Sequence, residues 1–283
     1  MSRRYRKEKL MENLIIESDN LIAMRKLLPK YEGKIDVMPI DPPYNTNISY
    51  VGYKDFDNDW NMFMRERLEV AYKLLSKFGV MFIHIDENEY VGLYNICSEI
   101  FGCENVRTLI WKKTNEYFDK NRIEKPFENG IRRTHEFVLL CCKNLKNTEL
   151  KPIMQPTLQN GKIVEVKKSL ETIIDFLGTT SSAKDEIAAL FGDRTAFATP
   201  KPMKLIKEFV RAASEKDSIV LDFFAGSGTT GHAVMDLNKE DGGSRKFILI
   251  TNNENNICQN ITVPRVRKAI DFFNYKETFD FLE

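Results

Sequence analysis

The feature that most constrains the fold is a repeated alternation between short apolar runs and segments with helical periodicity. The runs are rich in β-branched residues, which favour strands over helices. Two intervening segments, 63–75 and 204–213, carry apolar residues at mostly helical spacing. The sequence therefore predicts strands at 14–16, 35–40, 80–85, 107–111, 137–141, 219–223 and 247–250.

Strands that alternate with helices predict an α/β fold with a mainly parallel sheet covered on both faces. The alternation weakens between residues 144 and 195, where polar, turn-rich sequence takes over. We therefore expect one domain in two parts, residues 1–143 and 196–283, separated by a small insertion at 144–195.

The composition narrows the class of protein. A chain of 283 residues, 42% hydrophobic and 29% charged, can bury a sizeable core. No apolar run approaches the roughly 20 residues that span a bilayer, and no apolar signal segment follows the basic N-terminus. We expect a cytoplasmic protein. Five cysteines without C-x-x-C spacing and three histidines predict no metal site.

The charge pattern permits a nucleic-acid partner without demanding one. The net charge is +1, but basic residues gather at 3–9 and again between 112 and 133. Such clusters can neutralise phosphates while acidic residues elsewhere balance the total. A solvated surface of mixed charge explains these residues equally well.

The sharpest motif is Asp41-Pro42-Pro43-Tyr44, directly after the predicted strand 35–40. An acidic acceptor at the carboxyl end of a strand lies where open α/β sheets place their ligands. The two prolines restrict the backbone, and the tyrosine offers a face on which a planar base can stack.

A second motif begins where the predicted strand 219–223 runs into Gly226, Gly228 and Gly231 and then a helix. Glycines let the backbone approach a nucleotide-like ligand, and the helix N-terminus supplies free N–H groups. On its own this spacing suits a dinucleotide site equally well.

Together the two motifs resemble D-P-P-Y and F-x-G-x-G of the amino-methyltransferases of DNA, over about residues 12–270. D-P-P-Y in this family points to adenine N6, whereas S-P-P-Y is commoner in cytosine-N4 enzymes. The order of the motifs resembles the beta group, and most of all the Mod subunits of type III restriction–modification systems. The resemblance implies a circularly permuted, Rossmann-like methyltransferase fold that uses S-adenosylmethionine.

The resemblance also implies site residues. Asp41, Pro42, Pro43 and Tyr44 would be catalytic, and the segment Thr134 to Leu140 is similar to the strand that helps wall the base pocket. Pro39 departs from the pattern and could mark a bulge or the strand end. Polar residues before Glu254 could take its role. The implied cofactor-binding residues are Asp19, Asn20, Asp41, Lys201, Asp222, Phe223, Ala225, Gly226, Ser227, Gly228, Thr229, Thr230 and Glu254.

The function that follows is site-specific transfer of a methyl group to adenine N6 in double-stranded DNA, within a restriction–modification system. The target base would be flipped out, and transfer would be direct and in line. Residues 144–195 are the candidate target-recognition region. Possible partners are a second copy, a restriction subunit or a separate recognition protein, with no membrane. The alternatives are a cytosine-N4 methyltransferase, a non-catalytic nucleic-acid-binding module and a nicotinamide dehydrogenase.

Overall fold

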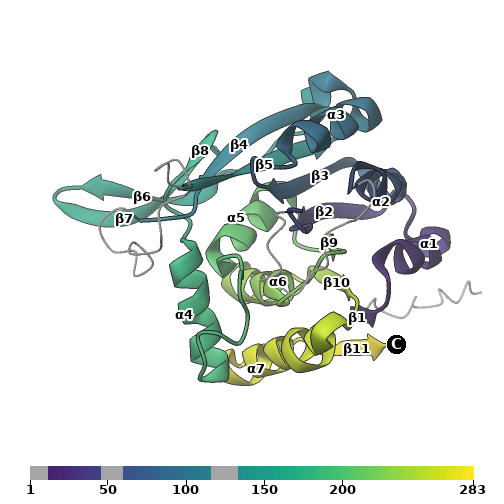
Figure 1. The fold of residues 1–283 in the computed structure, drawn as a ribbon. Coiled ribbons are helices and arrows are strands. Elements are labelled where there is room, and N and C mark those ends of the chain that lie inside the picture. The colour runs from purple at the N-terminus through teal and green to yellow at the C-terminus, as the bar shows by residue number, and fades with distance from the viewer. Residues whose placement is uncertain (1–11, 46–59, 116–132) are drawn as a thin grey trace, which may run out of the picture.

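The computed structural model describes residues 12–45, 60–115 and 133–283, and Figure 1 shows their arrangement. The strands are β1 Asn13–Glu17, β2 Ile35–Ile40, β3 Leu75–Ile85, β4 Val106–Lys112, β5 His135–Cys142, β6 Ile153–Gln159, β7 Lys162–Lys168, β8 Ile173–Ile174, β9 Ile219–Asp222, β10 Lys246–Thr251 and β11 Phe279–Leu282. The helices are α1 Asn20–Tyr31, α2 Trp60–Leu74, α3 Tyr90–Phe101, α4 Thr180–Phe191, α5 Met203–Ala213, α6 Thr229–Asp241 and α7 Val263–Phe273.

One large sheet organises the chain. Within the described residues its nine strands lie in the order β11-β1-β10-β9-β2-β3-β5-β4-β8. Strand β5 is antiparallel to β3 and β4, and the other neighbouring pairs are parallel. The predicted α/β sheet is confirmed, and it is mixed because of the reversed β5. Each strand expected from the sequence is present, although β3 begins earlier than expected, at Leu75.

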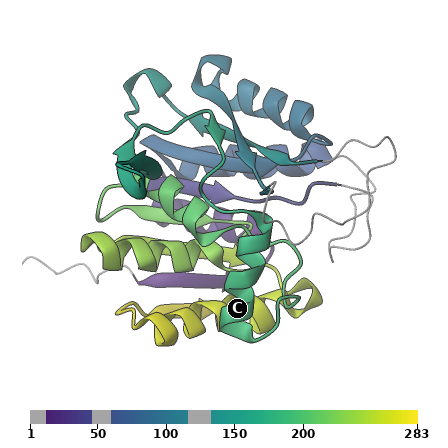
Figure 2. The same cartoon turned by 90° about the vertical axis from the view of Figure 1, so that its left-hand side faces the viewer.

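Helices cover both faces of this sheet. Helices α1, α2 and α3 lie on one face, and α5, α6 and α7 lie on the other (Figure 1, Figure 2). Successive residues of a strand point to opposite faces, so Phe82 of β3 belongs to one core cluster and Met81 to the other. Burial on both faces explains why the strands are continuous apolar runs in the sequence. Across the described ranges, no helix combines the length and apolarity needed to cross a bilayer.

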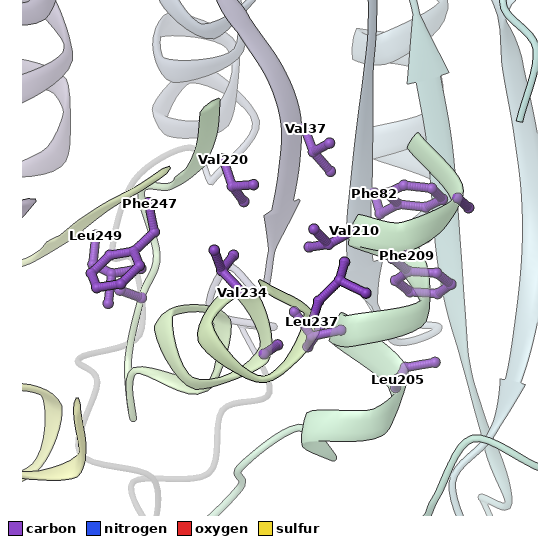
Figure 3. Close-up of a cluster of buried hydrophobic side chains, with 14 of the residues drawn as sticks. Val37, Phe82, Leu205, Phe209, Val210, Val220, Val234, Leu237, Phe247 and Leu249 are labelled. Atoms are coloured by element: carbon purple, nitrogen blue, oxygen red, sulfur yellow. The ribbon is translucent and has the colours of Figure 1, made fainter. Parts of the chain in front are cut away.

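Helix α5 is anchored over the centre of the sheet. Its Phe209 ring stacks on Phe82 of β3, with the ring centroids 4.4 Å apart and the planes 2° from parallel. Val210 of the same helix lies beside Val37 of β2 in the core cluster drawn in Figure 3. Because α5 starts at Met203, this packing also fixes the segment immediately before it, which includes Lys201.

Residues 144–195 are more ordered than their polar sequence suggests. Strands β6 and β7 form a hairpin that projects from the main body (Figure 1) and closes at Asn160 and Gly161, both with positive φ. Strand β8 pairs with β4 and extends the main sheet, while α4 packs against α7. The division of the chain at residues 144 and 195 stays a prediction.

The Phe82–Phe209 stack provides a test of this core. We expect Phe209→Ala to lower the free energy of unfolding by about 3 to 5 kcal/mol, because it removes a buried aromatic ring and leaves a cavity. Denaturant unfolding followed by circular dichroism measures the change. The matched control is Phe272→Ala, which truncates a ring that is 64% exposed on α7 and should cost about 0.5 kcal/mol or less. Equal losses in both variants would contradict the assignment of Phe209 to the central core.

Candidate active site

The candidate site lies at the carboxyl edge of the parallel strands. Asp41 follows β2 and Asp222 ends β9, while Asp19 follows β1. Strand β9 continues through α6 to β10 on one side, whereas β2 continues through α2 to β3 on the other. The chain connections therefore run in opposite directions across the sheet on the two sides of the β9–β2 boundary. Open α/β sheets form their ligand crevices at such a point. A single pair, Val37 with Val220, joins these two strands.

Pro39 lies inside β2 and remains in register with Phe82 of β3. The strand continues to Ile40, so Pro39 does not mark its end, and the register irregularity falls earlier, between Ile35 and Val37. A proline has no N–H with which to extend a ladder at its own position. It is therefore compatible with a strand that has a single ladder pair with β9, at Val37.

The exit from β2 holds the first motif in place. The indole N–H of Trp60 donates to the carbonyl of Pro43 at 2.8 Å. The Tyr44 hydroxyl lies 2.7 Å from Asp41 Oδ1 and 3.0 Å from Glu136 Oε2. These contacts direct the hydroxyl end of Tyr44 back toward the aspartate that precedes it by three residues.

A cluster of charged groups surrounds this aspartate. The carboxylate–lysine cluster consists of Asp41, Tyr44, Glu136 and Lys201. Lys201 donates to Asp41 Oδ2 at 2.7 Å and to the Tyr44 oxygen at 3.0 Å, and its ammonium lies 3.3 Å from Glu136 Oε2. On the far side, Lys113 donates to Glu136 Oε1 at 3.2 Å. The side chains of Lys201 and Glu136 are 7% and 8% exposed, whereas that of Asp41 is 31% exposed.

The charges of the cluster depend on one another. Burial raises the pKa of Asp41, and the negative Glu136 raises it further, although Lys201 acts in the opposite direction. Burial also disfavours the charged form of Glu136, but Lys201 and Lys113 outweigh it and lower its pKa to about 2. Burial and the two carboxylates raise the pKa of Tyr44, so its hydroxyl keeps its proton. Two carboxylates therefore share the central ammonium.

Asp222 is a second buried carboxyl group at this edge. It accepts hydrogen bonds from the Thr230 hydroxyl at 2.6 Å and from the Phe224 backbone N–H at 3.1 Å. Burial raises its pKa to about 7, and the neighbours that act on it are these two donors and the negative Asp41. No cation is among them, so a positively charged ligand would favour its ionised form.

The glycine turn follows directly. Gly226 and Gly228 have φ of 48° and 77°, a region that favours glycine. The Thr262 hydroxyl donates to the Gly226 carbonyl at 2.6 Å, and the Ala225 N–H donates to the carbonyl of Ile250 in β10 at 3.1 Å. The turn is thus held open in a fixed shape beside the end of β10.

Arg265 holds the glycine turn through two hydrogen bonds. This fully buried side chain on α7 donates to Ser227 Oγ at 2.9 Å and to Thr229 Oγ1 at 2.6 Å. The Ser227 and Thr229 side chains are buried as well. Their backbone, at the start of α6, is the part best placed for an incoming ligand. Their assignment to the cofactor stays a prediction.

Arg67 connects the ends of β1 and β9. It donates to Asp19 Oδ2 at 3.0 Å and to Asn20 Oδ1 at 2.6 Å. Asp19 also caps α1 by accepting from the Ile22 N–H, and Asn20 donates to the carbonyl of Phe223 at 2.8 Å. Asp19, Asn20 and the end of β9 are therefore parts of one hydrogen-bonded unit.

The sequence predicted most of the residues that lie at this edge of the sheet, but not the charged residues that hold them in place. Glu254 begins a short turn after β10 and is half-buried, so its predicted role remains open to its polar neighbours. An acid inside an apolar strand is a signal that could have singled out Glu136. An isolated arginine in a helix carries no such signal. Glu136 lies in the segment Thr134 to Leu140 that the resemblance placed at the base pocket, but no role of its own was predicted for it. The residues missed as site components are Lys113, Arg67 and Arg265.

Comparison with known proteins places this arrangement in a family. The family model described as DNA methylase matches residues 35–262. The chain belongs to the DNA methylase family. It is 31% identical to the Mod subunit of the type III restriction–modification enzyme StyLTI of Salmonella typhimurium, over 84% of this chain and 52% of that protein. It is 24% identical to the DNA adenine methyltransferase YhdJ of Escherichia coli, over 83% and 76% of the two chains. The chain spans about half the length of the Mod subunits StyLTI and EcoPI that it matches.

Solved structures share the fold. The crystal structure of the M1.HpyAVI–SAM complex superposes with a TM-score of 0.57 at 19% identity, covering 92% of this chain and 98% of that one. The cytosine-N4-specific PvuII DNA methyltransferase gives the same TM-score at 18% identity, covering 95% of each chain. The α/β fold of DNA methyltransferases is thus confirmed. The circular permutation stays a prediction.

The carboxylate–lysine cluster generates a stability prediction. We expect Lys201→Met to lower the free energy of unfolding by about 3 kcal/mol at neutral pH, because Asp41 and Glu136 lose their shared cation. Without Lys201 the pKa of Glu136 should rise, and that of Asp41, which burial already raises, should rise further. The destabilisation should therefore shrink as the pH falls toward about 4. Denaturant unfolding at several pH values measures this.

Lys204→Met is the matched control for this variant. Lys204 lies on α5 and pairs at the surface with Glu165, where the two side chains are 35% and 47% exposed. Its loss should cost less than about 1 kcal/mol at any of these pH values, because exposed ion pairs contribute little. A Lys201→Met loss that stays constant with pH would contradict the charge-sharing arrangement.

Proposed function

We propose that this protein is a site-specific DNA methyltransferase that transfers a methyl group from S-adenosylmethionine to adenine N6 in double-stranded DNA. The observation that carries the proposal is the position of Asp41-Pro42-Pro43-Tyr44 at the sheet's switch point, on the neighbouring strand to the glycine turn. Membership of the DNA methylase family supports it, as do relatives named as restriction–modification Mod subunits.

The choice of adenine depends on the motif and the relatives. The fold does not discriminate, since a cytosine-N4-specific enzyme superposes as well as M1.HpyAVI does. Asp41 gives the motif its adenine-type first residue, and the relative YhdJ is named a DNA adenine methyltransferase. Cytosine N4 is the second candidate, because a cytosine-N4-specific enzyme shares this fold.

The residues at the sheet edge fit S-adenosylmethionine. The ligand carries a positive sulfonium and an adenosine, and when bound it would supply an electrophilic methyl group. Asp222, buried and without a cationic neighbour among the groups that act on it, could balance a positive ligand. The glycine turn offers backbone N–H groups at the start of α6. Asp19 and Asn20 at the end of β1 would line the adenosine end of the site.

In the proposed mechanism the first motif, Asp41 to Tyr44, binds and activates the target base. The adenine amino nitrogen is a poor nucleophile because its lone pair is delocalised into the ring. Hydrogen bonds from that amino group to Asp41 and to the Pro42 carbonyl would localise the pair and stabilise the positive charge that develops. As the new N–C bond forms, the bond between the methyl carbon and the sulfonium sulfur would break and leave a neutral thioether, and the nitrogen releases one proton. Asp41 is partly exposed and can pass this proton to water. The Tyr44 ring would stack on the flipped base and hold it in line.

Contacts with DNA would come from several segments. The basic residues 3–9 and most of those between 112 and 133 lie outside the described residues. The β6–β7 hairpin exposes Leu158 and Ile163 near its turn, together with Lys162, Lys167 and Lys168. This hairpin is the candidate element for recognition of the DNA sequence within residues 144–195. A restriction subunit is the partner that the names of the Mod relatives favour, and a second copy of the chain stays a prediction. A monomer mass that does not change with concentration would count against a homodimer.

The most informative experiment is methylation of plasmid DNA by the purified protein with labelled S-adenosylmethionine. Nucleoside analysis identifies the base, and mapping of the modified sites reads the recognition sequence. N6-methyladenine is the expected product. N4-methylcytosine would support the second candidate. Cofactor binding without transfer to any DNA would support a non-catalytic binding module instead.

Variants of the first motif test the catalytic assignment. We expect Asp41→Ala and Tyr44→Ala to lower methyl transfer by about a hundredfold or more, because each removes a group that contacts the reacting base. Tyr44→Ala should retain most of its affinity for S-adenosylmethionine. Single-turnover transfer and isothermal titration measure these effects, and circular dichroism checks the fold. Full activity in either alanine variant would reject the assignment.

Asp222 predicts a pH dependence of cofactor binding. Its pKa of about 7 means that it gains charge as the pH rises through neutrality. Affinity for the positively charged S-adenosylmethionine should therefore increase over that range, by up to about tenfold per pH unit below the pKa. Titration calorimetry on either side of pH 7 measures the trend. In Asp222→Asn the dependence should be largely absent, and an unchanged slope in that variant would assign it to another group.

A further inference from the structure

Asp41, the proposed acceptor of the adenine amino group, is already engaged within the protein. Lys201 donates to one of its carboxylate oxygens and the Tyr44 hydroxyl to the other, both at 2.7 Å. An ammonium at this distance neutralises much of the carboxylate charge. It therefore weakens Asp41 both as a hydrogen-bond acceptor and as a base. A target amino group has to compete with these internal donors.

Glu136 offers a second position to both donors. Its Oε2 lies 3.0 Å from the Tyr44 oxygen and 3.3 Å from the Lys201 ammonium. Tyr44 has one hydroxyl proton, so it can donate to Asp41 or to Glu136 but not to both at once. Since both donors lie between the two carboxylates, a displacement of a few tenths of an ångström exchanges their partners.

The two carboxylates differ in what else can reach them. Glu136 lies within β5, in register with Trp111 of β4, and its side chain is 8% exposed. Lys113 occupies its other oxygen, and the buried ring of His84 lies behind it with Nδ1 at 4.0 Å. Burial and the positive Lys201 hold the pKa of His84 at about 3, so the ring is neutral. Glu136 is therefore a fixed, charged group, whereas the more exposed Asp41 is open to the site.

We propose that Glu136 is a positioning residue that draws Lys201 and the Tyr44 hydroxyl away from Asp41 when the target base enters. The exchange frees both carboxylate oxygens of Asp41, which can then accept the hydrogen bond of the adenine amino group. This inference rests on the proposed function. It adds that the activity of Asp41 is set by a carboxylate that does not touch the substrate.

The alternative is that Glu136 only balances the buried charge of Lys201. The maximal kcat separates the two, because the charge of Glu136 raises the pKa of Asp41 in either case and a shift of the acidic limb must therefore come with a fall in kcat. Asp41 faces Tyr44, Lys201 and Glu136, and it acts on Asp222 of β9. Among these, Glu136 competes with Asp41 for the cation. A change in that competition should move the ionisation of Asp41 itself, which a loss of packing or stability would not do.

The first test is Glu136→Gln, which keeps the shape of the side chain and removes its charge. Lys201 should then remain on Asp41. We expect kcat to fall about tenfold or more, while the KM for DNA stays within about twofold, because DNA is still held through its phosphates. The acidic limb of the kcat–pH profile should move to lower pH, because an undivided cation lowers the pKa of Asp41.

The matched variant is Lys113→Gln, which removes the other cation on Glu136. Lys201 should then be drawn further toward Glu136, and the acidic limb should move to higher pH. The prediction is thus a pair of shifts with opposite signs. If Glu136→Gln does not fold by circular dichroism, the upward shift in Lys113→Gln tests the proposal alone.

The outcomes distinguish this inference from the proposed function. A wild-type protein that methylates no DNA rejects the proposed function itself. An active wild type with a Glu136→Gln variant of unchanged kcat overturns the positioning role, whether or not the acidic limb moves. So do shifts of the limb in the same direction in the Glu136 and Lys113 variants.

Discussion

The Lys201 ammonium, held between Asp41 and Glu136, is the interaction on which the site depends. Burying two carboxylates is costly unless cations accompany them, and here Lys201 and Lys113 do so. Asp41 and Lys201 are 160 positions apart in the chain. Their pairing therefore requires that the strands around β2 and the helix α5 pack as one body. The stack of Phe209 on Phe82 provides that packing and sets where Lys201 lies.

The sheet determines where such a cluster can meet a ligand. Helices cover both faces, so a ligand approaches from an edge. Between β9 and β2 the chain connections diverge to opposite sides, which is the point where open α/β sheets leave an opening for a ligand. The first motif leaves β2 on one side of this opening and Asp222 ends β9 on the other. Asp222, on which no cation acts, thus lies on the strand next to that of Asp41, which shares Lys201 with Glu136.

The sequence predicted the parts of the molecule that are encoded locally. Because the strands are buried on both faces, each appears in the sequence as an apolar run. The residue types from Asp41 to Tyr44 are determined by the chemistry that they would perform. The roles of Glu136 and Arg67 were missed because their partners are distant: Tyr44 is 92 positions from Glu136, and Asn20 is 47 from Arg67. The only local signal is the acidic Glu136 inside an apolar strand, and it does not identify the partner. Strand β8 was missed for a related reason, since its two residues pair with β4 through tertiary contact alone.

A methyl acceptor site of this kind places conflicting demands on its carboxylate. The group must be charged to accept hydrogen bonds from an amino group, but burial favours the neutral acid. A neighbouring cation restores the charge, yet it also occupies the carboxylate that the substrate needs. A second carboxylate resolves the conflict, because it can hold the cation nearby while the first is in use. Glu136 meets the requirements for this second group: it is buried, charged at neutral pH through Lys201 and Lys113, and within 3.3 Å of the shared ammonium.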